Sequence, residues 1–291
     1  MIAARSDVGH WRRTARRLRS DRRSLIAAGA LVSVVLLVLV GPWLSAYAPY
    51  EQLDITNLVH VAPGSRHLLG TDAFSRDVLS RVLSGGRISL AVAGSAVLIE
   101  TLVGVAWGLG AGLAGDRLDT VMMRAVDAGM SVPRVLLLLA LLAAIPQVPL
   151  PLLVLTLGFT GWFGIARLVR AEVRSLRHAD FVMAARTLGA KPLRLALRHL
   201  LPQVMGPVLV ASTLAIGQVI VLEAGLSWLG IGVQPPQASW GNIIRDGTEF
   251  IATAPWVSMA PGCCLIVVVL SVSALGDGLR DALAPGQLPR T

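Results

Sequence analysis

Two acidic residues, Glu100 and Glu223, each lie inside a long apolar run of the chain. A charged side chain in hydrocarbon costs roughly 2.5 kcal/mol or more, so such an acid either pairs with a polar group of a neighbouring helix or lines a polar path. The sequence leaves both possibilities open. Glu223 lies about 19 residues beyond the start of its run, roughly 28 Å at the rise of a helix, and shortly before Trp240. We take Glu100, Glu223 and Trp240 as candidates for lining such a path.

Catalytic chemistry finds little support in the residue pattern. The sole lysine, Lys191, is not preceded by the glycines of a Gly-x-x-x-x-Gly-Lys-Ser/Thr phosphate-binding loop. Histidines, cysteines and carboxylates show neither metal-ligand spacing nor a Ser/His/Asp pattern. Cys263 and Cys264 are adjacent, point apart on a helix, and are expected to be packing residues. We therefore expect no enzyme activity, no metal and no cofactor bound by this chain itself.

A further distinctive stretch runs from residue 180 to residue 202, between two strongly apolar segments. Its sequence predicts two short helices that meet at an elbow. Asp180 is placed to cap a first helix over residues 181–188, and Gly189 stands where a helix ends in a left-handed residue. Pro192 suits the first turn of a second helix, and Pro202 is expected to end it.

The second of these predicted helices is amphipathic. Leu193, Leu197 and Leu200 recur at helical spacing on one face, and Arg194 and Arg198 share another. A face of this kind, held outside a bilayer, suits docking to another protein.

The composition identifies an all-α integral membrane protein. Of 291 residues, 54% are hydrophobic and 15% are charged, with a mean hydropathy of +0.69. About 20 apolar helical residues cross roughly 30 Å of hydrocarbon. Six runs of sufficient length are expected to span the membrane, at residues 25–44, 88–113, 121–145, 149–169, 204–229 and 256–275. The third run is interrupted by Arg124, Asp127 and Pro133, so we expect that it either enters the membrane late or is kinked at Pro133.

The distribution of arginine sets the predicted orientation. Six spans place both termini on one side, together with the basic N-terminal tail and the basic region around residues 167–198. Cytoplasmic loops accumulate Lys and Arg, so both termini are predicted to be cytoplasmic. The net charge of +9 then faces anionic lipid headgroups, and no nucleic-acid partner is needed to explain it.

These assignments divide the chain into five parts. A basic cytoplasmic tail (1–24) precedes the first transmembrane helix (25–45). A five-helix core (88–280) precedes a second cytoplasmic tail (281–291), and residues 171–203 form the cytoplasmic loop of this core. Between the first helix and the core lies an extracytoplasmic segment (46–87). Val78, Leu79, Val82 and Leu83 predict an amphipathic helix in this segment, lying on the outer membrane surface and closed by the glycines at 85 and 86.

The stretch at 180–202 resembles the cytoplasmic coupling-loop signature of bacterial ABC-importer permeases, which runs Glu-Ala-Ala, three residues, Gly, nine residues, Ile, one residue, Leu-Pro. The matching positions are Ala184, Ala185, Gly189, Leu201 and Pro202. The chain departs from the signature in having Met183 in place of Glu and His199 in place of Ile.

Further matches are similar to the C-type permease subunits of oligopeptide and dipeptide importers. Residues 67–81 resemble the stretch His-Pro-Leu-Gly-Thr-Asp followed by Gly-Arg-Asp-Val-Leu-Ser-Arg, with Leu68 replacing Pro and Ser75 replacing Gly. Other matches lie at residues 119–133, 223–242 and 275–283. They are ordered along the chain from residue 67 to residue 283.

The resemblance implies a permease subunit of a bacterial inner-membrane importer for peptides. It implies a heterodimer with a homologous B-type permease, two cytoplasmic ATPase subunits that bind ATP and Mg²⁺, and an extracytoplasmic peptide-binding protein. The residues that would receive ATPase motion are Asp180, Ala184, Ala185, Gly189, Arg194, Arg198 and Pro202.

Two alternatives stay open at this point. One is an importer of nickel or another small solute from the same branch. The other is a self-sufficient secondary transporter or channel, which usually shows an internal repeat or several intramembrane charges.

Overall fold

The computed structural model describes residue 14 and residues 16–283, and every named element in this part of the chain is helical. Most of both predicted tails therefore lies outside the described residues. The helices are α2 (Arg22–Leu44), α3 (Val78–Leu113), α4 (Asp116–Ser131), α5 (Arg134–Leu142), α6 (Leu150–Gly161), α7 (Phe163–Leu176), α8 (Asp180–Thr187), α9 (Pro192–Leu195), the π-helical turn η1 (Ala196–Leu200), α10 (Leu201–Trp228), α11 (Trp240–Thr248) and α12 (Trp256–Leu283).

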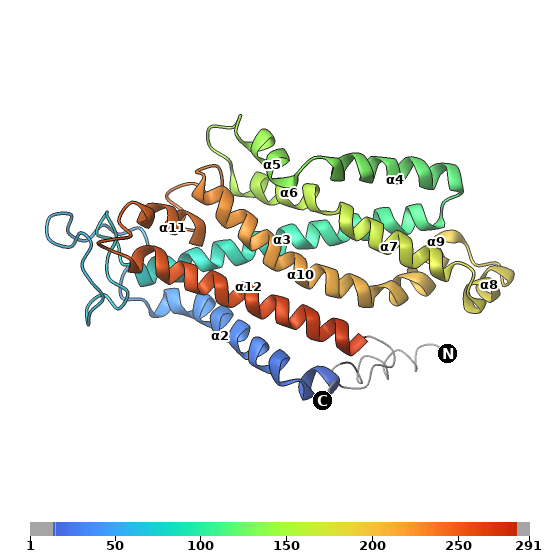
Figure 1. Cartoon of the computed structure of the whole chain (residues 1–291), viewed down its shortest axis with the longest axis horizontal. Helices are drawn as coiled ribbons and strands as arrows, with labels where there is room; N and C mark the ends of the chain where they lie inside the picture. Colours follow the sequence, from blue (N-terminus) through green and yellow to red (C-terminus); the bar gives the residue numbers. More distant parts are fainter. Residues whose placement is uncertain (1–13, 15, 284–291) are drawn as a thin grey trace.

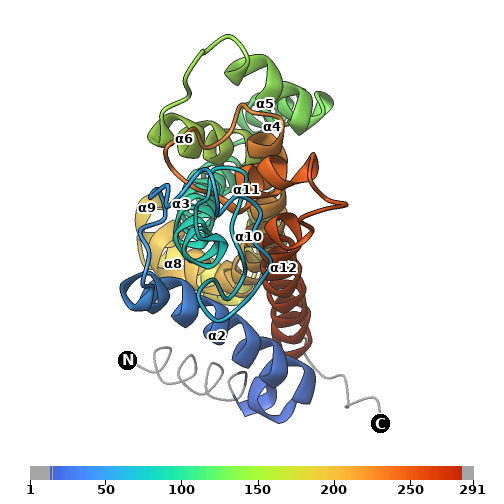
Figure 2. The ribbon, with the colours of Figure 1, turned by 90° about the vertical axis from the view of Figure 1, so that its left-hand side faces the viewer.

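The long helices form one elongated bundle (Figure 1). Seen along its axis, α3 and α10 lie near the centre, α2 lies at one edge beside α12, and α5 lies toward the opposite edge (Figure 2). The α8 elbow protrudes at one end of the bundle, and the loop between α2 and α3 occupies the other.

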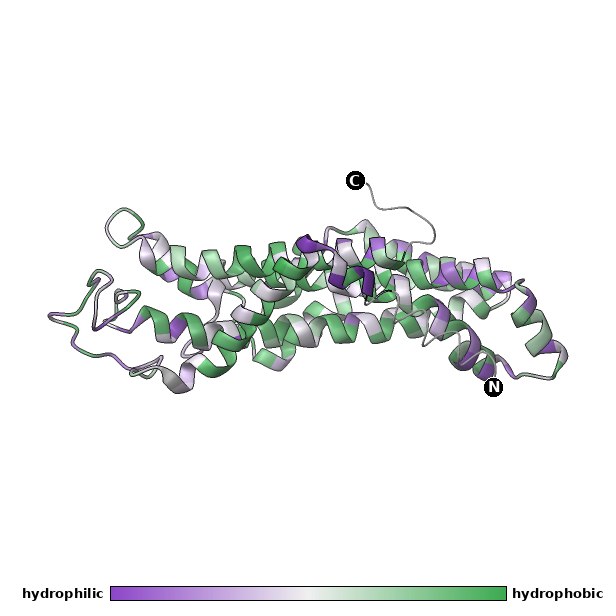
Figure 3. Ribbon diagram, turned by 90° about the horizontal axis from the view of Figure 1, so that it is seen from below, coloured by the Kyte–Doolittle hydropathy of each residue, from purple (hydrophilic) through white to green (hydrophobic). Residues whose placement is uncertain are grey.

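Five helices in the described part of the chain are long and apolar enough to cross a membrane, and a sixth crossing results if α4 and α5 form one bent span. The long helices are mostly hydrophobic over their central stretches, and hydrophilic residues become more frequent toward the α8 end (Figure 3). The expected kink is confirmed: α4 and α5 meet at an angle of 80° on either side of Val132 and Pro133. Proline disfavours helical backbone in the residue before it, which accounts for a break at this place.

The predicted surface helix around residue 80 is wrong. Asp77 caps α3 by accepting a hydrogen bond from the Ser80 backbone N–H at 2.9 Å, and the helix then continues to Leu113. Gly85 and Gly86 do not close it. A Cβ at residue 86 would lie 2.8 Å from the Trp240 ring, so this glycine allows α3 and α11 to pack closely rather than ending a helix.

The buried side chains form two apolar clusters. The larger joins α2, α3, α5, α6, α10, α11 and α12, and includes Leu138, Leu153, Ile220 and Trp240. The smaller lies toward the α8 end and joins α7, α8, α9 and α10. The second cluster supports the elbow described below.

Candidate functional site

The elbow between α8 and α9, residues 180–200, is built around a left-handed glycine. Gly189 has φ of +79°, and its neighbour Ala190 donates from its backbone N–H to the Ala185 carbonyl at 3.0 Å. This bond closes the end of α8 in the manner of a glycine C-cap. The predicted elbow at Gly189 and the start of a second helix at Pro192 are both confirmed.

Two details of the predicted elbow are wrong. Ala179, not Asp180, is the N-cap of α8; Asp180 lies in the first turn, where its charge favours the positive end of the helix without a capping hydrogen bond. Pro202 does not end the second helix, because it occupies the first turn of α10, where a missing N–H costs no helical hydrogen bond. The α9 helix therefore runs through η1 into α10 as one long element.

The leucine face predicted for the second helix is also wrong. Leu200 is fully buried, whereas Leu193 and Leu197 are more than half exposed. The π-helical turn at 196–200 inserts extra backbone and rotates the register, so the buried face consists of Leu195, Ala196 and Leu200.

The outer surface of the elbow combines apolar and basic side chains. Leu188 is 89% exposed at its tip, although it is large and hydrophobic. The other large apolar residues exposed here are Phe181, Met183, Leu193 and Leu197, and they are interspersed with the exposed Arg186, Arg194 and Arg198. Such a patch at the protruding end of the bundle is typical of a protein-docking surface (Figure 1).

The inner surface of the elbow is firmly attached to the bundle. Val182 and Ala185 of α8 pack in the smaller apolar cluster with Val173 of α7 and Val204 of α10. Helix α7 in turn lies directly against α3, because Gly112 of α3 leaves no room for a Cβ beside Val173.

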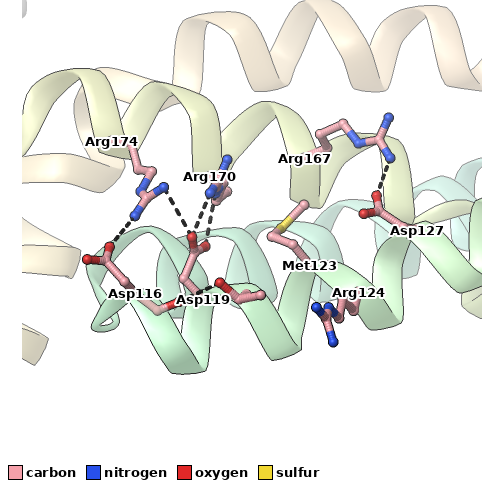
Figure 4. Close-up of a pocket in the computed structure, with 9 residues that line it drawn as sticks. Asp116, Asp119, Met123, Arg124, Asp127, Arg167, Arg170 and Arg174 are labelled. Atoms are coloured by element: carbon pink, nitrogen blue, oxygen red, sulfur yellow. Dashed lines mark hydrogen bonds and ion pairs between the residues drawn. The ribbon is translucent and has the colours of Figure 1, made fainter.

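A row of ion pairs joins α4 to α7 near the same end of the bundle (Figure 4). Asp119 accepts from Arg170 at 2.9 and 2.5 Å and lies 3.3 Å from Arg174. Two flanking pairs, Asp116 with Arg174 at 2.7 Å and Asp127 with Arg167 at 2.6 Å, extend the row.

The same side chains line an open groove of about 650 Å³ together with Thr120, Met123 and Arg124. Sequence reasoning used the α7 arginines for topology alone. Their spacing of three and four residues, which places them on one helix face, was the signal that they act together.

The candidate Glu100 is engaged inside the bundle. It is buried and pairs with Arg134 at the start of α5. Arg134 also donates to the Leu157 carbonyl at 2.7 Å, and its Nε lies 3.4 Å from the Thr160 hydroxyl, so α3, α5 and α6 meet at one polar contact. Arg134 was not identified from the sequence as the partner of Glu100.

Glu223 and Trp240 are brought together through α3. The Ser89 hydroxyl donates to Glu223 at 2.8 Å, and the Trp240 backbone N–H donates to the same hydroxyl oxygen at 3.2 Å. Ser227 supplies a second donor to Glu223 at 2.7 Å. Both Glu223 and Trp240 are fully buried within this chain, so the cluster ties α3, α10 and α11 together. Glu100 belongs to a separate contact.

The residues at 67–81 form a folded clasp at the opposite end from α8. Arg81 is buried and lies between Asp72 at 3.4 Å and Asp246 of α11 at 3.2 Å. Arg76 pairs with Asp72 at 2.7 Å. The Trp256 indole of α12 donates to the Thr71 carbonyl at 3.2 Å. The clasp thereby fastens the α2–α3 loop to α11 and α12.

Ser75 occupies a left-handed backbone position in this clasp, with φ of +58°. Its hydroxyl compensates by donating to the Asp54 carbonyl at 2.7 Å. In the same loop, the carboxylate of Asp54 accepts hydrogen bonds from the Asn57 side-chain amide and from the backbone N–H groups of Thr56 and Asn57. These bonds hold the pKa of Asp54 below its usual range. Within residues 16–283 no group of three or more His, Cys, Asp or Glu side chains could hold a metal ion.

Comparison with known proteins places this arrangement in a family. Residues 104–288 match the profile of the binding-protein-dependent transport system inner membrane component, and residues 9–63 match the N-terminal transmembrane domain of oligopeptide transport permease C. The oligopeptide transport system permease protein OppC of Bacillus subtilis (strain 168) is 34% identical over 284 residues, covering 97% of this chain and 92% of that protein.

A Brucella suis biovar 1 (strain 1330) protein named as a peptide permease is 38% identical, covering 96% of this chain and 92% of that protein. Among solved structures, a chain of the inward-facing MetNI methionine ABC transporter matches with a TM-score of 0.57 and 19% identity. The match covers 69% of this chain and 96% of that one, and supports the same fold.

Proposed function

The chain belongs to the family of binding-protein-dependent transport system inner membrane components, and from that premise we propose that it is a permease subunit of an ATP-driven importer for oligopeptides or dipeptides. It is a multi-pass membrane protein. The observation that carries the proposal is the similarity, over nearly the whole chain, to a permease named for oligopeptide transport. The match of residues 9–63 to the oligopeptide-specific N-terminal domain supports the same substrate class.

We propose that the α8 end of the bundle is cytoplasmic in a bacterial inner membrane. The excess of arginine in α7 and the elbow supports this orientation, since positive charge accumulates on the cytoplasmic side. The clasp at residues 67–81 then lies outside, where a peptide-binding protein would deliver its cargo. The N-terminus and C-terminus would both be cytoplasmic.

We propose that the elbow docks on an ATPase subunit. Its exposed apolar residues and arginines would fit a groove with apolar walls and an acidic or carbonyl-lined rim, and the contact would be partly electrostatic. ATP and Mg²⁺ would be bound by two such partner subunits, since this chain carries no phosphate-binding loop. Motion received at α8 would pass to α7, and from there to α3 by close packing and to α4 by the ion pairs.

A homologous B-type permease would complete the translocation path, because one such chain supplies only half of it. Arg134 is the intramembrane charge that would reach this path. Its side chain is 24% exposed in the isolated subunit, and exposure of a charge to lipid is costly, so we propose that its exposed part faces the path or the partner permease. Glu100 would serve as its fixed counter-ion.

Reconstituted transport tests the proposal. The chain would be placed in liposomes with a B-type permease, ATPase subunits and a peptide-binding protein. Uptake of a labelled tripeptide would then be measured with ATP, without ATP and without the binding protein. The proposal expects uptake that requires all components. Uptake of nickel but not peptide would assign the small-solute alternative, and ATP-independent uptake by this chain alone would assign a secondary transporter.

A further inference from the structure

Helix α2 contains a proline at a position where a backbone hydrogen bond must be lost. Pro42 has no N–H, and in an α-helix the N–H of residue 42 would donate to the carbonyl of Val38. That carbonyl cannot bond to lipid, so its free acceptor must be satisfied by another part of the protein.

An arginine of α3 supplies the missing donors. Arg87 Nε donates to the Val38 carbonyl at 2.9 Å, and its Nη2 donates to the next carbonyl along the helix, that of Leu39. The guanidinium carbon also lies 4.8 Å from the centre of the Trp43 ring, within the range of a cation–π contact. One arginine thus contacts two successive carbonyls and one aromatic ring of the proline turn.

The two helices approach closely around this contact. A Cβ at Gly41 would lie 2.7 Å from the side chain of Leu83, and a Cβ at Gly86 would lie 2.7 Å from the side chain of Val38. The backbones are therefore held near enough for a side chain of α3 to reach carbonyls of α2.

Helix prolines elsewhere in the described part of the chain lack such a partner. Pro207 in α10 and Pro261 in α12 free the carbonyls of Gln203 and Val257, and no side-chain donor of the described residues bonds to either. Among the described helices the arginine contact is therefore particular to α2, which packs mainly against α12 and α3 and leaves most of its surface uncovered.

We propose that Arg87 is the docking residue of the N-terminal helix: its guanidinium binds the carbonyls freed by Pro42 and fixes the outer end of α2 on the five-helix core. The proline makes the binding site, and the arginine recognises it.

Disulfide formation between introduced cysteines would measure the docking in the membrane-embedded subunit. With Cys263 and Cys264 replaced by alanine, the pair Gly41→Cys and Leu83→Cys reports on the outer end of α2. The pair Ser24→Cys and Gly278→Cys reports on the inner end, where the two Cβ positions lie 3.3 Å apart. Arg87→Leu should slow cross-linking of the outer pair by about 10-fold, the effect of losing a hydrogen bond to a charged group, and should leave the inner pair unchanged.

The decisive variant restores the backbone donor. Pro42→Ala gives residue 42 an N–H that occupies the Val38 carbonyl within α2, so Arg87→Leu should slow cross-linking less in the Pro42→Ala background than in the native one. Arg87→Lys, which keeps the charge but not the two-pronged geometry, should be intermediate. An unchanged rate with Arg87→Leu alone would overturn the proposal. Equal slowing by Arg87→Leu in the native and Pro42→Ala backgrounds would do so too, because it would mean that the arginine does not act through the proline turn.

Discussion

The elbow at Gly189 allows a prediction worked from backbone geometry. Its φ of +79° is disfavoured for residues with a Cβ, at a cost of about 1–2 kcal/mol, and more for a β-branched side chain. Apart from the two neighbouring residues, no atom of the described part of the chain lies within 4 Å of a Cβ placed there, so no clash with those residues would destabilise Gly189→Val. The strain alone should reduce the population of the elbow conformation by about 5–30-fold.

Binding of the ATPase subunit should weaken by a similar factor, because only the population with the correct elbow can bind. Gly189→Val should leave the permease inserted in the membrane, while less ATPase subunit remains on the purified complex and less peptide is transported per ATP hydrolysed. Gly189→Asn is the matched control, since asparagine tolerates the left-handed region, and Ala190→Ser should be mild. Full ATPase retention and normal uptake with Gly189→Val would refute the assignment of this stretch as the coupling element.

Three further predictions concern the rest of the chain. Cysteines placed at Ser175 and Gln237 should react with impermeant labels from opposite faces of the membrane, Ser175 from the cytoplasm; labelling from one face would contradict the topology. Glu223→Gln retains an acceptor for one serine of the buried cluster, so the complex should still assemble. Peptide uptake or basal ATPase activity should change; if neither changes, Glu223 is a structural residue. Asp119→Arg should destabilise the α4–α7 contact by about 1.5–3 kcal/mol and lower the unfolding temperature in detergent. Arg170→Asp in the same chain should recover part of that lost stability. No recovery would argue against a direct pair between residues 119 and 170.

The elements that could be predicted from the sequence are those with a strong local signal. The apolar runs gave the crossing helices to within a few residues at most ends, and Gly189, Pro192 and Pro133 marked turns that are present in the structure. Each of these residues restricts its own backbone whatever surrounds it, so no knowledge of tertiary packing was required.

The errors occurred where tertiary contacts decide the outcome. Gly86 was taken as a helix end, yet Trp240 from 154 positions later in the chain packs at that glycine, and the helix continues. Pro202 was taken as the end of the second helix, yet it lies in the first turn of a longer one. That position depends on the preceding π-helical turn, which the sequence does not reveal. Sequence spacing cannot indicate either contact.

The candidate acids show the same division. Their place inside apolar runs was evident from hydropathy, and in the structure Glu223 and Trp240 meet through the hydroxyl of Ser89. The partners Ser89 and Arg134 could not be predicted, since each comes from a helix whose facing depends on the whole bundle.

Contact between the elbow and an ATPase subunit is the central claim, and site-specific photo-cross-linking tests it most directly. A photoreactive side chain in place of Leu188, the exposed tip of the elbow, would be compared with the same side chain in place of Ile55, an exposed residue at the opposite end of the bundle. In complexes assembled with all partner subunits, position 188 should cross-link to the ATPase subunit and position 55 should not. Absence of an ATPase adduct at position 188, or its appearance at position 55, would contradict the account.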